Sequence, residues 1–400
     1  MNSEIRKWDS RFIRNMIKLN YGKGLREDQR RKGYYPVYGS NGIVGFHDKY
    51  LVEGPGIIIG RKGNVGSVRF SKDNFWPIDT TYYLTIHGIG DFEFWYYFLQ
   101  TIKLDEMNTH SAVPGLNREN VYNLEIAIPD YAEQTAIANI LSNLDTKIEL
   151  NQQMNKTLES IAQSLFKHWF IDFEFPDVND QPYKSSGGEM IDSELEMIPK
   201  GWHVSKIGKE FKTILGGTPS TMNKSYWENG TIPWINSGKI NEFRIIEPSE
   251  YITENAVKES ATKLMPKGTV VLAITGATLG QISIIEIDTC GNQSVVGIIP
   301  TEILNSEYLY FTLQANLNKL ISNQTGGAQQ HINKGNIENL QIIVPEDIVI
   351  NKFKAVSEPI FENISKRCFE NLALSKIRDL LLPKLMSGKI RVSMEETSVG

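Results

Sequence analysis

The chain contains two copies of one unit, and this duplication constrains its fold more than any other feature. The segment FEFWYYFLQ (92–100) precedes the similar SEYLYFTLQ (306–314) by 214 positions. GLNRENVYNLEIAIP (115–129) precedes HINKGNIENLQIIVP (331–345) by 216 positions. A register held over so long a stretch predicts two similar domains and excludes a solenoid of short repeats.

Each copy begins with a globular stretch and ends with a long helix. Short apolar runs bounded by glycine, such as GIIIG (56–60), predict strands. Residues 132–170 contain no Gly or Pro and place apolar residues at alternating spacings of four and three, which predicts a coiled-coil helix. A second such helix is predicted from about Ile350, with Pro383 expected to kink or end it. The predicted seam residues are Ile137, Leu141, Leu144, Ile148, Leu158, Leu165, Trp169, Ile360, Ile364, Leu374, Leu381 and Leu385.

These patterns predict an α+β fold in which two similar domains, each with a twisted mixed or antiparallel sheet and short helices, are separated by the two long helices. One helix after each copy favours an antiparallel coiled coil within the chain, with a pseudo-two-fold repeat, over a coiled coil between two chains. The predicted boundaries are 1–130 for the first domain, 131–175 for its helix, 176–200 for a linker, 201–346 for the second domain, 347–390 for its helix and 391–400 for a tail.

The net charge of −5 has the wrong sign for a uniformly basic coat on nucleic acid. The average conceals a split, because residues 1–72 carry a net charge of +9 and residues 73–130 carry −7. Two cysteines, Cys290 and Cys368, do not make a disulfide scaffold. Without a secretory signal or an apolar run long enough to cross a bilayer, we expect a cytoplasmic protein.

No recognisable catalytic motif occurs in the sequence. Glycine-rich phosphate loops, HExxH, paired CxxC and GxSxG patterns are all missing. Pro129–Asp130 followed by Asp145 and Lys147 fits a loose metal-dependent nuclease pattern. Asp145 and Lys147 lie on the predicted helix, however, so we interpret them as part of a solvated helix face. We therefore predict no catalytic, metal or cofactor site in this chain.

Polar, glycine-rich loops recur at matched positions in the two copies. Asn, Gln, Ser, Thr, Arg and Lys are the side chains that read base edges and hold phosphates. Any one such loop is more often an ordinary turn, but four matched loops per copy, with different polar residues in each, favour two recognition surfaces of different specificity. The candidate DNA-binding residues are Ser40, Asn41, Arg61, Lys62, Asn64, Thr80, Thr81, His110, Ser237, Lys239, Thr275, Thr278, Gln293, Gln329, Gln330 and His331.

The chain resembles the specificity (S) subunits of type I restriction-modification systems. In the second copy the resemblance rests on IPKGWHVSKIGKEF, GGTPST, IPWINSGKI, GTVVLAITGATLG and LLLPKLMSGKI. In the first copy it rests on YYPVYGSNGIVG, GIIIGRKGNVG and LFKHWFIDFEFP. Together these strings cover essentially residues 1–390.

The resemblance implies that each globular unit is a target recognition domain reading one half of a bipartite, asymmetric DNA sequence. It implies that the helix pair sets the gap between the half-sites and docks two modification subunits. Those subunits would hold S-adenosylmethionine, and the motor-nuclease subunits recruited through the complex would use ATP and Mg²⁺. The chain itself would be a non-catalytic subunit.

Two other classes of protein stay open at this point. A stand-alone restriction enzyme or DNA methyltransferase would act on DNA unaided. An interaction protein that does not bind DNA, with two domains on a coiled-coil arm, would explain the helices but not the paired polar loops.

Overall fold

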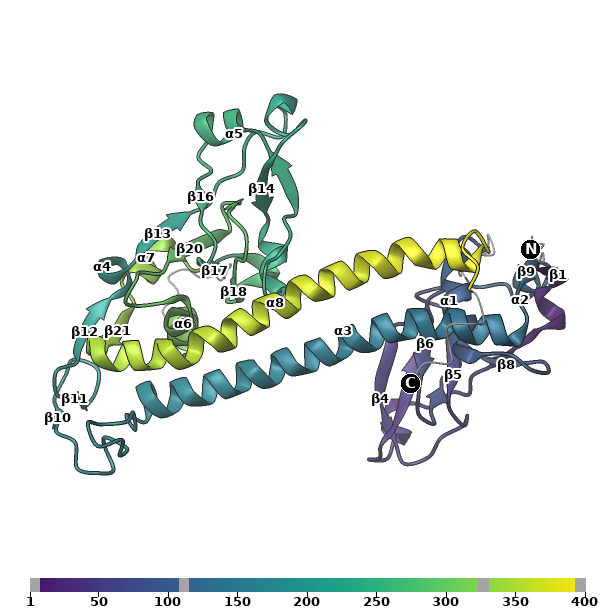
Figure 1. The fold of residues 1–400 in the computed structure, drawn as a ribbon, viewed down its shortest axis with the longest axis horizontal. Helices are drawn as coiled ribbons and strands as arrows, with labels where there is room; N and C mark the ends of the chain where they lie inside the picture. Colours follow the sequence, from purple (N-terminus) through teal and green to yellow (C-terminus); the bar gives the residue numbers. More distant parts are fainter. Residues whose placement is uncertain (1–7, 108–114, 323–330, 393–400) are drawn as a thin grey trace, which may run out of the picture. The chain divides into compact units, whose positions relative to one another are not determined.

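The computed structural model describes residues 8–107, 115–322 and 331–392, which form two compact units. The first unit contains residues 1–149 and 372–400, and the second contains residues 150–371. Each unit therefore combines one globular domain with a part of each long helix, α3 (Tyr131–Phe166) and α8 (Asp347–Met386) (Figure 1).

The first domain is built on two small sheets and a two-stranded ribbon. The larger sheet is antiparallel and has the order β2 (Ile17–Tyr21), β8 (Thr81–Ile86), β5 (Gly56–Gly60), β6 (Val68–Ser71). The smaller sheet pairs β3 (Tyr35–Gly39) with β4 (Gly42–His47) antiparallel and with β7 (Trp76–Pro77) parallel. The ribbon joins β1 (Asp9–Phe12) to β9 (Glu125–Ile128), and the helices are α1 (Phe92–Thr101) and α2 (Arg118–Tyr122).

The second domain repeats this topology. Its larger sheet has the order β13 (Lys212–Leu215), β20 (Val295–Ile299), β17 (Val270–Ala273), β18 (Ile282–Ile284). Its smaller sheet has the order β15 (Glu250–Ile252), β14 (Ile232–Ile235), β19 (Thr289–Gly291), β16 (Leu264–Met265), again with one parallel pair, β14 and β19. The ribbon joins β12 (His203–Lys206) to β21 (Gln341–Val344), and the helices are α4 (Ile207–Glu210), α5 (Glu254–Glu259), α6 (Ser306–Ser322) and α7 (Lys334–Glu338).

Both long helices run antiparallel to each other within each unit. In the first unit, Ile137 and Leu141 near the start of α3 belong to one buried cluster with Leu385 near the end of α8. In the second unit the ring of Phe166 at the end of α3 lies 6.3 Å from that of Phe353 near the start of α8. The predicted fold class, with two similar α+β domains and an antiparallel helix pair, is therefore confirmed.

The start of α3 follows from local chemistry. The Asp130 carboxylate accepts a hydrogen bond from the backbone N–H of Glu133 at 3.0 Å, which caps the first turn of α3. The helix does not stop at Phe166 but passes into a π-helical turn, Lys167–Ile171, that buries Trp169 and Phe170. This turn completes the segment 132–170 that the heptad pattern predicts as helical.

Two sequence expectations require adjustment. Of the two outcomes expected at Pro383, a kink or an end, the end does not occur. The helix α8 continues to Met386, since proline removes only one backbone donor near the helix end. The segment predicted as a linker also has structure of its own. It contains the hairpin strands β10 (Met190–Ile191) and β11 (Ile198–Pro199), and the ring of Tyr183 stacks on Phe175 at 4.6 Å.

Candidate nucleic-acid interface

In the first domain, three loops that are far apart in sequence converge at one end of the sheets. The turn between β3 and β4 meets the loop after β5, because the Ser67 hydroxyl donates to the Ser40 carbonyl at 2.6 Å and the Asn64 N–H donates to the Ser40 hydroxyl at 3.4 Å. The loop before β8 joins them through the Arg61 N–H, which donates to the Thr80 carbonyl at 2.9 Å. We call this set the first loop cluster; its predicted members are Ser40, Asn41, Arg61, Lys62, Asn64 and Thr80.

Thr81 does not belong to this surface, so the prediction that it contacts DNA was wrong. Its side chain is fully buried and its hydroxyl donates to the Ile78 carbonyl at 2.8 Å. Equivalent backbone hydrogen bonds show that Thr81 corresponds to Val295 in the second copy. The Gly22 N–H donates to the Thr81 carbonyl, and the Gly216 N–H donates to the Val295 carbonyl. Thr81 therefore occupies a core position that the other domain fills with valine.

Arg61 is held by an aromatic side chain that the sequence analysis missed. Its guanidinium lies 5.2 Å from the ring centroid of Tyr21 and donates through Nη2 to the Asp79 carbonyl at 2.7 Å. Arg118, at the start of α2, lies 5.2 Å from the same Tyr21 ring. Burial, and then the neighbouring Tyr21, raises the pKa of Tyr82 to about 12, so this second ring stays neutral beneath the cluster.

Within residues 8–107, 115–322 and 331–392, the two guanidinium groups have little local charge compensation. Arg118 has the exposed Glu119 carboxylate 3.9 Å away as its ion-pair partner, and Arg61 bonds to a backbone carbonyl rather than to an acid. Stacking on an aromatic ring restricts an arginine while leaving donors at its edge. The cluster therefore presents two restrained positive charges beside the polar loops, an arrangement that suits a phosphate.

Other basic residues of the N-terminal segment are engaged within the domain. The Arg30 guanidinium donates to the Val44 carbonyl at 2.6 Å, and Arg31 pairs with Asp48 at 3.2 Å. These contacts hold the strand β4 against the loop before β3.

In the second domain, five segments converge in the equivalent place. The Thr218 hydroxyl donates to the Gln293 side chain at 2.5 Å, and the Thr275 hydroxyl donates to the Ser294 hydroxyl at 2.6 Å. The 3₁₀ turn Ser237–Asn241 lies beside the 3₁₀ turn Gly276–Thr278. We call this set the second loop cluster; its predicted members are Ser237, Lys239, Thr275, Thr278, Gln293 and His331.

Backbone hydrogen bonds show that the two clusters are equivalent. The Leu116 N–H donates to the Arg61 carbonyl at 2.9 Å, and the Ile332 N–H donates to the Ile274 carbonyl at 3.0 Å. The same bond thus ties the segment before α2 or α7 to the loop of the larger sheet. Exposed His331 precedes Ile332 directly and so lies next to this loop.

Several predicted residues form contacts within the domain or lie outside the described residues. Lys239 forms an ion pair with Glu242 at 2.7 Å, which compensates its charge. The Thr278 hydroxyl donates to the Thr275 carbonyl at 3.3 Å within its own turn. His110, Gln329 and Gln330 lie outside the described residues. Sequence reasoning missed Tyr21, Arg118, Thr218 and Ser294, whose only signal was their place next to glycine-rich loops.

The fold separates the two aspartates of the nuclease-like pattern. Asp130 caps the start of α3, whereas Asp145, fifteen residues farther on, accepts hydrogen bonds from Tyr97 and Arg378, both at 2.6 Å. Fifteen residues of helix separate two positions by about 22 Å, far more than one metal ion spans. Among residues 8–107, 115–322 and 331–392, no group of three His, Cys, Asp or Glu side chains is arranged to hold a metal.

Two copies of one loop-bearing α+β domain, each built onto the same pair of long helices, define a recognition protein with two sites. The model of the type I restriction modification DNA specificity domain matches residues 5–160 and 199–353. The chain therefore belongs to the family of type I restriction-modification specificity subunits. Within the part of the chain that the structure describes, no helix is both long and apolar enough to span a bilayer.

Individual relatives agree with this family. The type I restriction enzyme MjaIX specificity subunit of Methanocaldococcus jannaschii is 31% identical over 309 residues, covering 75% of this chain and 69% of that protein. The HindI specificity subunit of Haemophilus influenzae is 28% identical over 330 residues, covering 69% of this chain and 71% of that protein. The fold is similar to that of the type I S subunit of M. genitalium, with a TM-score of 0.63 at 19% identity over 98% of both chains.

Proposed function

We propose that this chain reads a bipartite, asymmetric DNA target for a type I restriction-modification complex, with one loop cluster on each half-site. The observation that carries the proposal is the convergence of polar loops at the same end of both domains, through equivalent backbone hydrogen bonds at Leu116 and Ile332. Polar side chains on rigid loops are suited to reading base edges, at about 1–3 kcal/mol of discrimination for each good bidentate contact.

The first loop cluster has two kinds of residue for this task. Ser40, Asn41 and Asn64 carry short polar groups near the turn between β3 and β4, and we assign them to base edges. Arg61 and Arg118 stack on Tyr21 and are assigned to the DNA backbone, because paired guanidinium groups complement a phosphate.

The long helices would set the gap between the half-sites. At 1.5 Å per residue, the 36 residues of α3 extend about 54 Å and the 40 residues of α8 about 60 Å. Major-groove sites on one face of DNA are separated by about 34–36 Å or its multiples. Helices of this length are sufficient to carry two domains to such sites.

The helix surface also supports docking of other subunits. Leu150, Met154 and Ile161 on α3 have exposed fractions of 48%, 37% and 51%, and their spacings of four and seven place them on one face. Exposed apolar residues in such a row are typical of protein interfaces. We infer that two modification subunits holding S-adenosylmethionine bind here, and that motor-nuclease subunits using ATP and Mg²⁺ join through them in the cytoplasm.

The experiment exchanges one domain and maps methylation. Residues 201–346 are replaced by the corresponding segment of a specificity subunit with a different target, and methylated bases are mapped in host DNA carrying each chain. We expect one half of the motif to change while the other half and the gap are retained. An unchanged motif, or loss of both halves from an assembled complex, would contradict the proposal.

A further inference from the structure

The second unit contains one buried arginine whose surroundings suggest a role beyond folding. Arg244 is the only arginine in residues 119–366, a stretch with 18 lysines. Its side chain is 0% exposed. The segment that carries it is fixed to β18, because the Ser283 hydroxyl donates to the Glu242 carbonyl at 2.9 Å and the Ile245 N–H donates to the Ile284 carbonyl at 3.0 Å.

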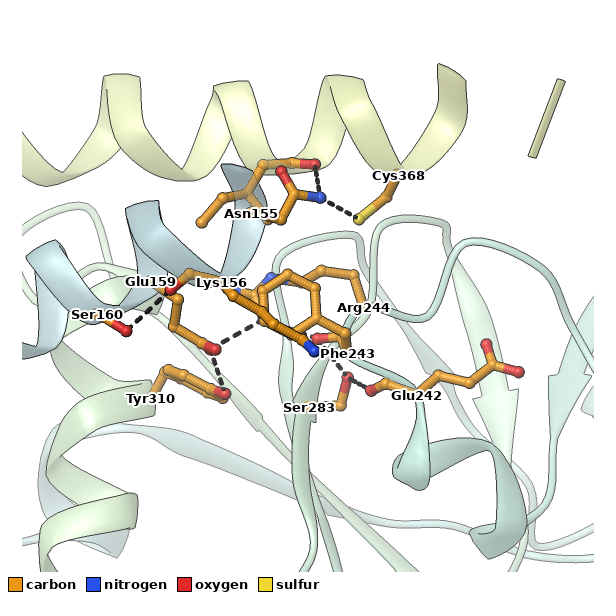
Figure 2. A network of polar contacts seen from close by, with 11 residues as sticks. Asn155, Lys156, Glu159, Ser160, Glu242, Phe243, Arg244, Ser283, Tyr310 and Cys368 are labelled. Atoms are coloured by element: carbon orange, nitrogen blue, oxygen red, sulfur yellow. Dashed lines mark hydrogen bonds and ion pairs between the residues drawn. The ribbon is translucent and has the colours of Figure 1, made fainter. Parts of the chain in front are cut away.

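Side chains from several elements surround this guanidinium. Its central carbon lies 4.5 Å from the ring centroid of Phe243, 5.1 Å from that of Tyr310 on α6 and 5.0 Å from that of Phe361 on α8. Glu159 of α3 lies 3.7 Å from Nη1 and accepts a hydrogen bond from the Tyr310 hydroxyl at 2.8 Å (Figure 2). Arg244 therefore joins the recognition domain to both long helices.

Stability alone is a poor explanation for this arrangement. Removing a cation from water carries a large desolvation penalty, which one carboxylate at 3.7 Å offsets only in part. Among the described residues, Nε and Nη2 have no hydrogen-bond partner, and Nη1 donates to the Phe243 carbonyl at 2.7 Å. An apolar residue of similar volume would avoid the penalty, whereas only a planar cation combines stacking on three rings with a directed ion pair.

We propose that Arg244 is a positioning residue that fixes the angle at which the second recognition domain is mounted on the helices, and thereby the gap length that the complex accepts. This inference rests on the proposed function. Apolar contacts are not directional and permit small sliding movements between packed elements. The ion pair to Glu159 selects one of these arrangements, as buried polar groups select one register in coiled coils.

The test measures gap selectivity in the complete complex with its modification subunits. Methylation rates are compared on duplexes that keep both half-sites but have the native gap, one base pair more or one base pair fewer. For Arg244→Met and for Glu159→Gln we expect the preference for the native gap to fall by about fivefold or more. Arg244→Lys, which keeps the charge but not the planar stacking, should lie between these variants and the unmodified chain.

Two controls separate positioning from stability. Ile298, on β20, is neither a member of the ion pair nor one of the three rings packed on Arg244. Ile298→Ala opens a cavity in the same domain and should lower the Tm with the gap preference unchanged. The double variant Arg244→Met with Glu159→Gln removes both charges, so it should fold better than Arg244→Met alone and still lose gap selectivity.

The outcomes are distinct. An equal fall in rate at all three gaps, or an unchanged preference in a folded double variant, would overturn the role of Arg244. If the unmodified complex itself showed no gap preference, or did not require both half-sites, the proposed function would fail instead.

Discussion

At the scale of single residues, Arg61 and Arg118, which both stack on Tyr21, can be used to distinguish contacts to the DNA backbone from contacts to bases. If Arg118 holds a phosphate, Arg118→Ala should weaken DNA binding by the complex about equally for all sequences. It should also reduce the slope of the logarithm of the DNA-binding constant against the logarithm of the salt concentration by about 1. Fluorescence anisotropy over a salt series measures both quantities.

Arg11 is a suitable control for this variant. It lies on the β1 ribbon rather than on the first loop cluster, and its side chain is 59% exposed. Arg11→Ala should leave the slope unchanged. A loss confined to one base pair of the target after Arg118→Ala would assign Arg118 to base reading instead.

Glu307, in the first turn of α6, gives a prediction about pH. Burial, assisted by the nearby Glu358, raises the pKa of this carboxyl from 4.5 to about 7, although its backbone hydrogen bond, Arg244 and Lys354 oppose the shift. The folded chain then binds the proton more tightly than the unfolded chain, so stability falls as the pH rises from about 4.5 to 7.

Glu307→Gln should remove this pH dependence. Because the amide cannot ionise, we expect the variant to gain up to about 3 kcal/mol at pH 8 relative to the unmodified chain and to gain little at pH 4.5. Urea unfolding at several pH values measures the difference. The same substitution at exposed Glu254 should have no effect, and parallel pH profiles for Glu307→Gln and the unmodified chain would contradict the assignment.

At the scale of elements, the seam between α3 and α8 is interrupted by buried polar residues. The side-chain amide of Asn151 donates to the side-chain carbonyl oxygen of Asn371 at 2.9 Å and to the Glu370 carboxylate at 2.7 Å. Asn155 is also buried, and its amide donates to the Ile364 carbonyl at 3.5 Å. Such pairs disfavour a slipped register, because slippage would leave their amides unpaired.

The spacing role of the helices can be tested by lengthening both. Seven residues inserted after Glu149 and seven after Asn371 preserve the heptad phase and add about 10 Å to each helix. We expect the gap in the methylated motif to grow by about three base pairs with both half-sites unchanged. A seven-residue insertion after Gly187, in an exposed turn outside the helices, should leave the gap as it was. An unchanged gap in an active complex with lengthened helices would exclude the spacing role.

At the scale of the whole molecule, the net charge of −5 averages over regions with different roles. The segment 1–72 has a net charge of +9. It contains β1 to β6 and supplies Ser40, Asn41, Arg61 and Lys62 to the first loop cluster. Acidic residues elsewhere reduce nonspecific attraction to DNA. We therefore expect partner subunits to supply much of the positive surface on which the DNA lies.

Duplication is also a property of the whole molecule. The two domains share the order of their larger sheets, one parallel strand pair in each smaller sheet and one terminal ribbon. Their loop residues differ, so Arg61 in one copy corresponds to Ile274 in the other. One scaffold can therefore carry two specificities.

The duplication, the two long helices and the loops that carry polar residues could all be predicted from the amino-acid sequence. These features depend on local periodicity and on residue types, which can be recognised in the sequence without any knowledge of strand pairing. The predicted helix 132–170 corresponds to α3 and its π-helical turn, and the glycine-rich loops flank the strands of both larger sheets.

Which polar side chains are exposed for binding depends on how the strands pair and the domains pack. Thr81 is buried because β8 lies between β2 and β5, a pairing that no local pattern reveals. Tyr21 and Arg118 meet across nearly a hundred residues because β2 and α2 pack in one domain. Arg244 reaches Glu159 because the second domain packs on α3. Contacts between distant residues depend on strand register and packing, which are set by the whole domain and not by neighbours in the chain.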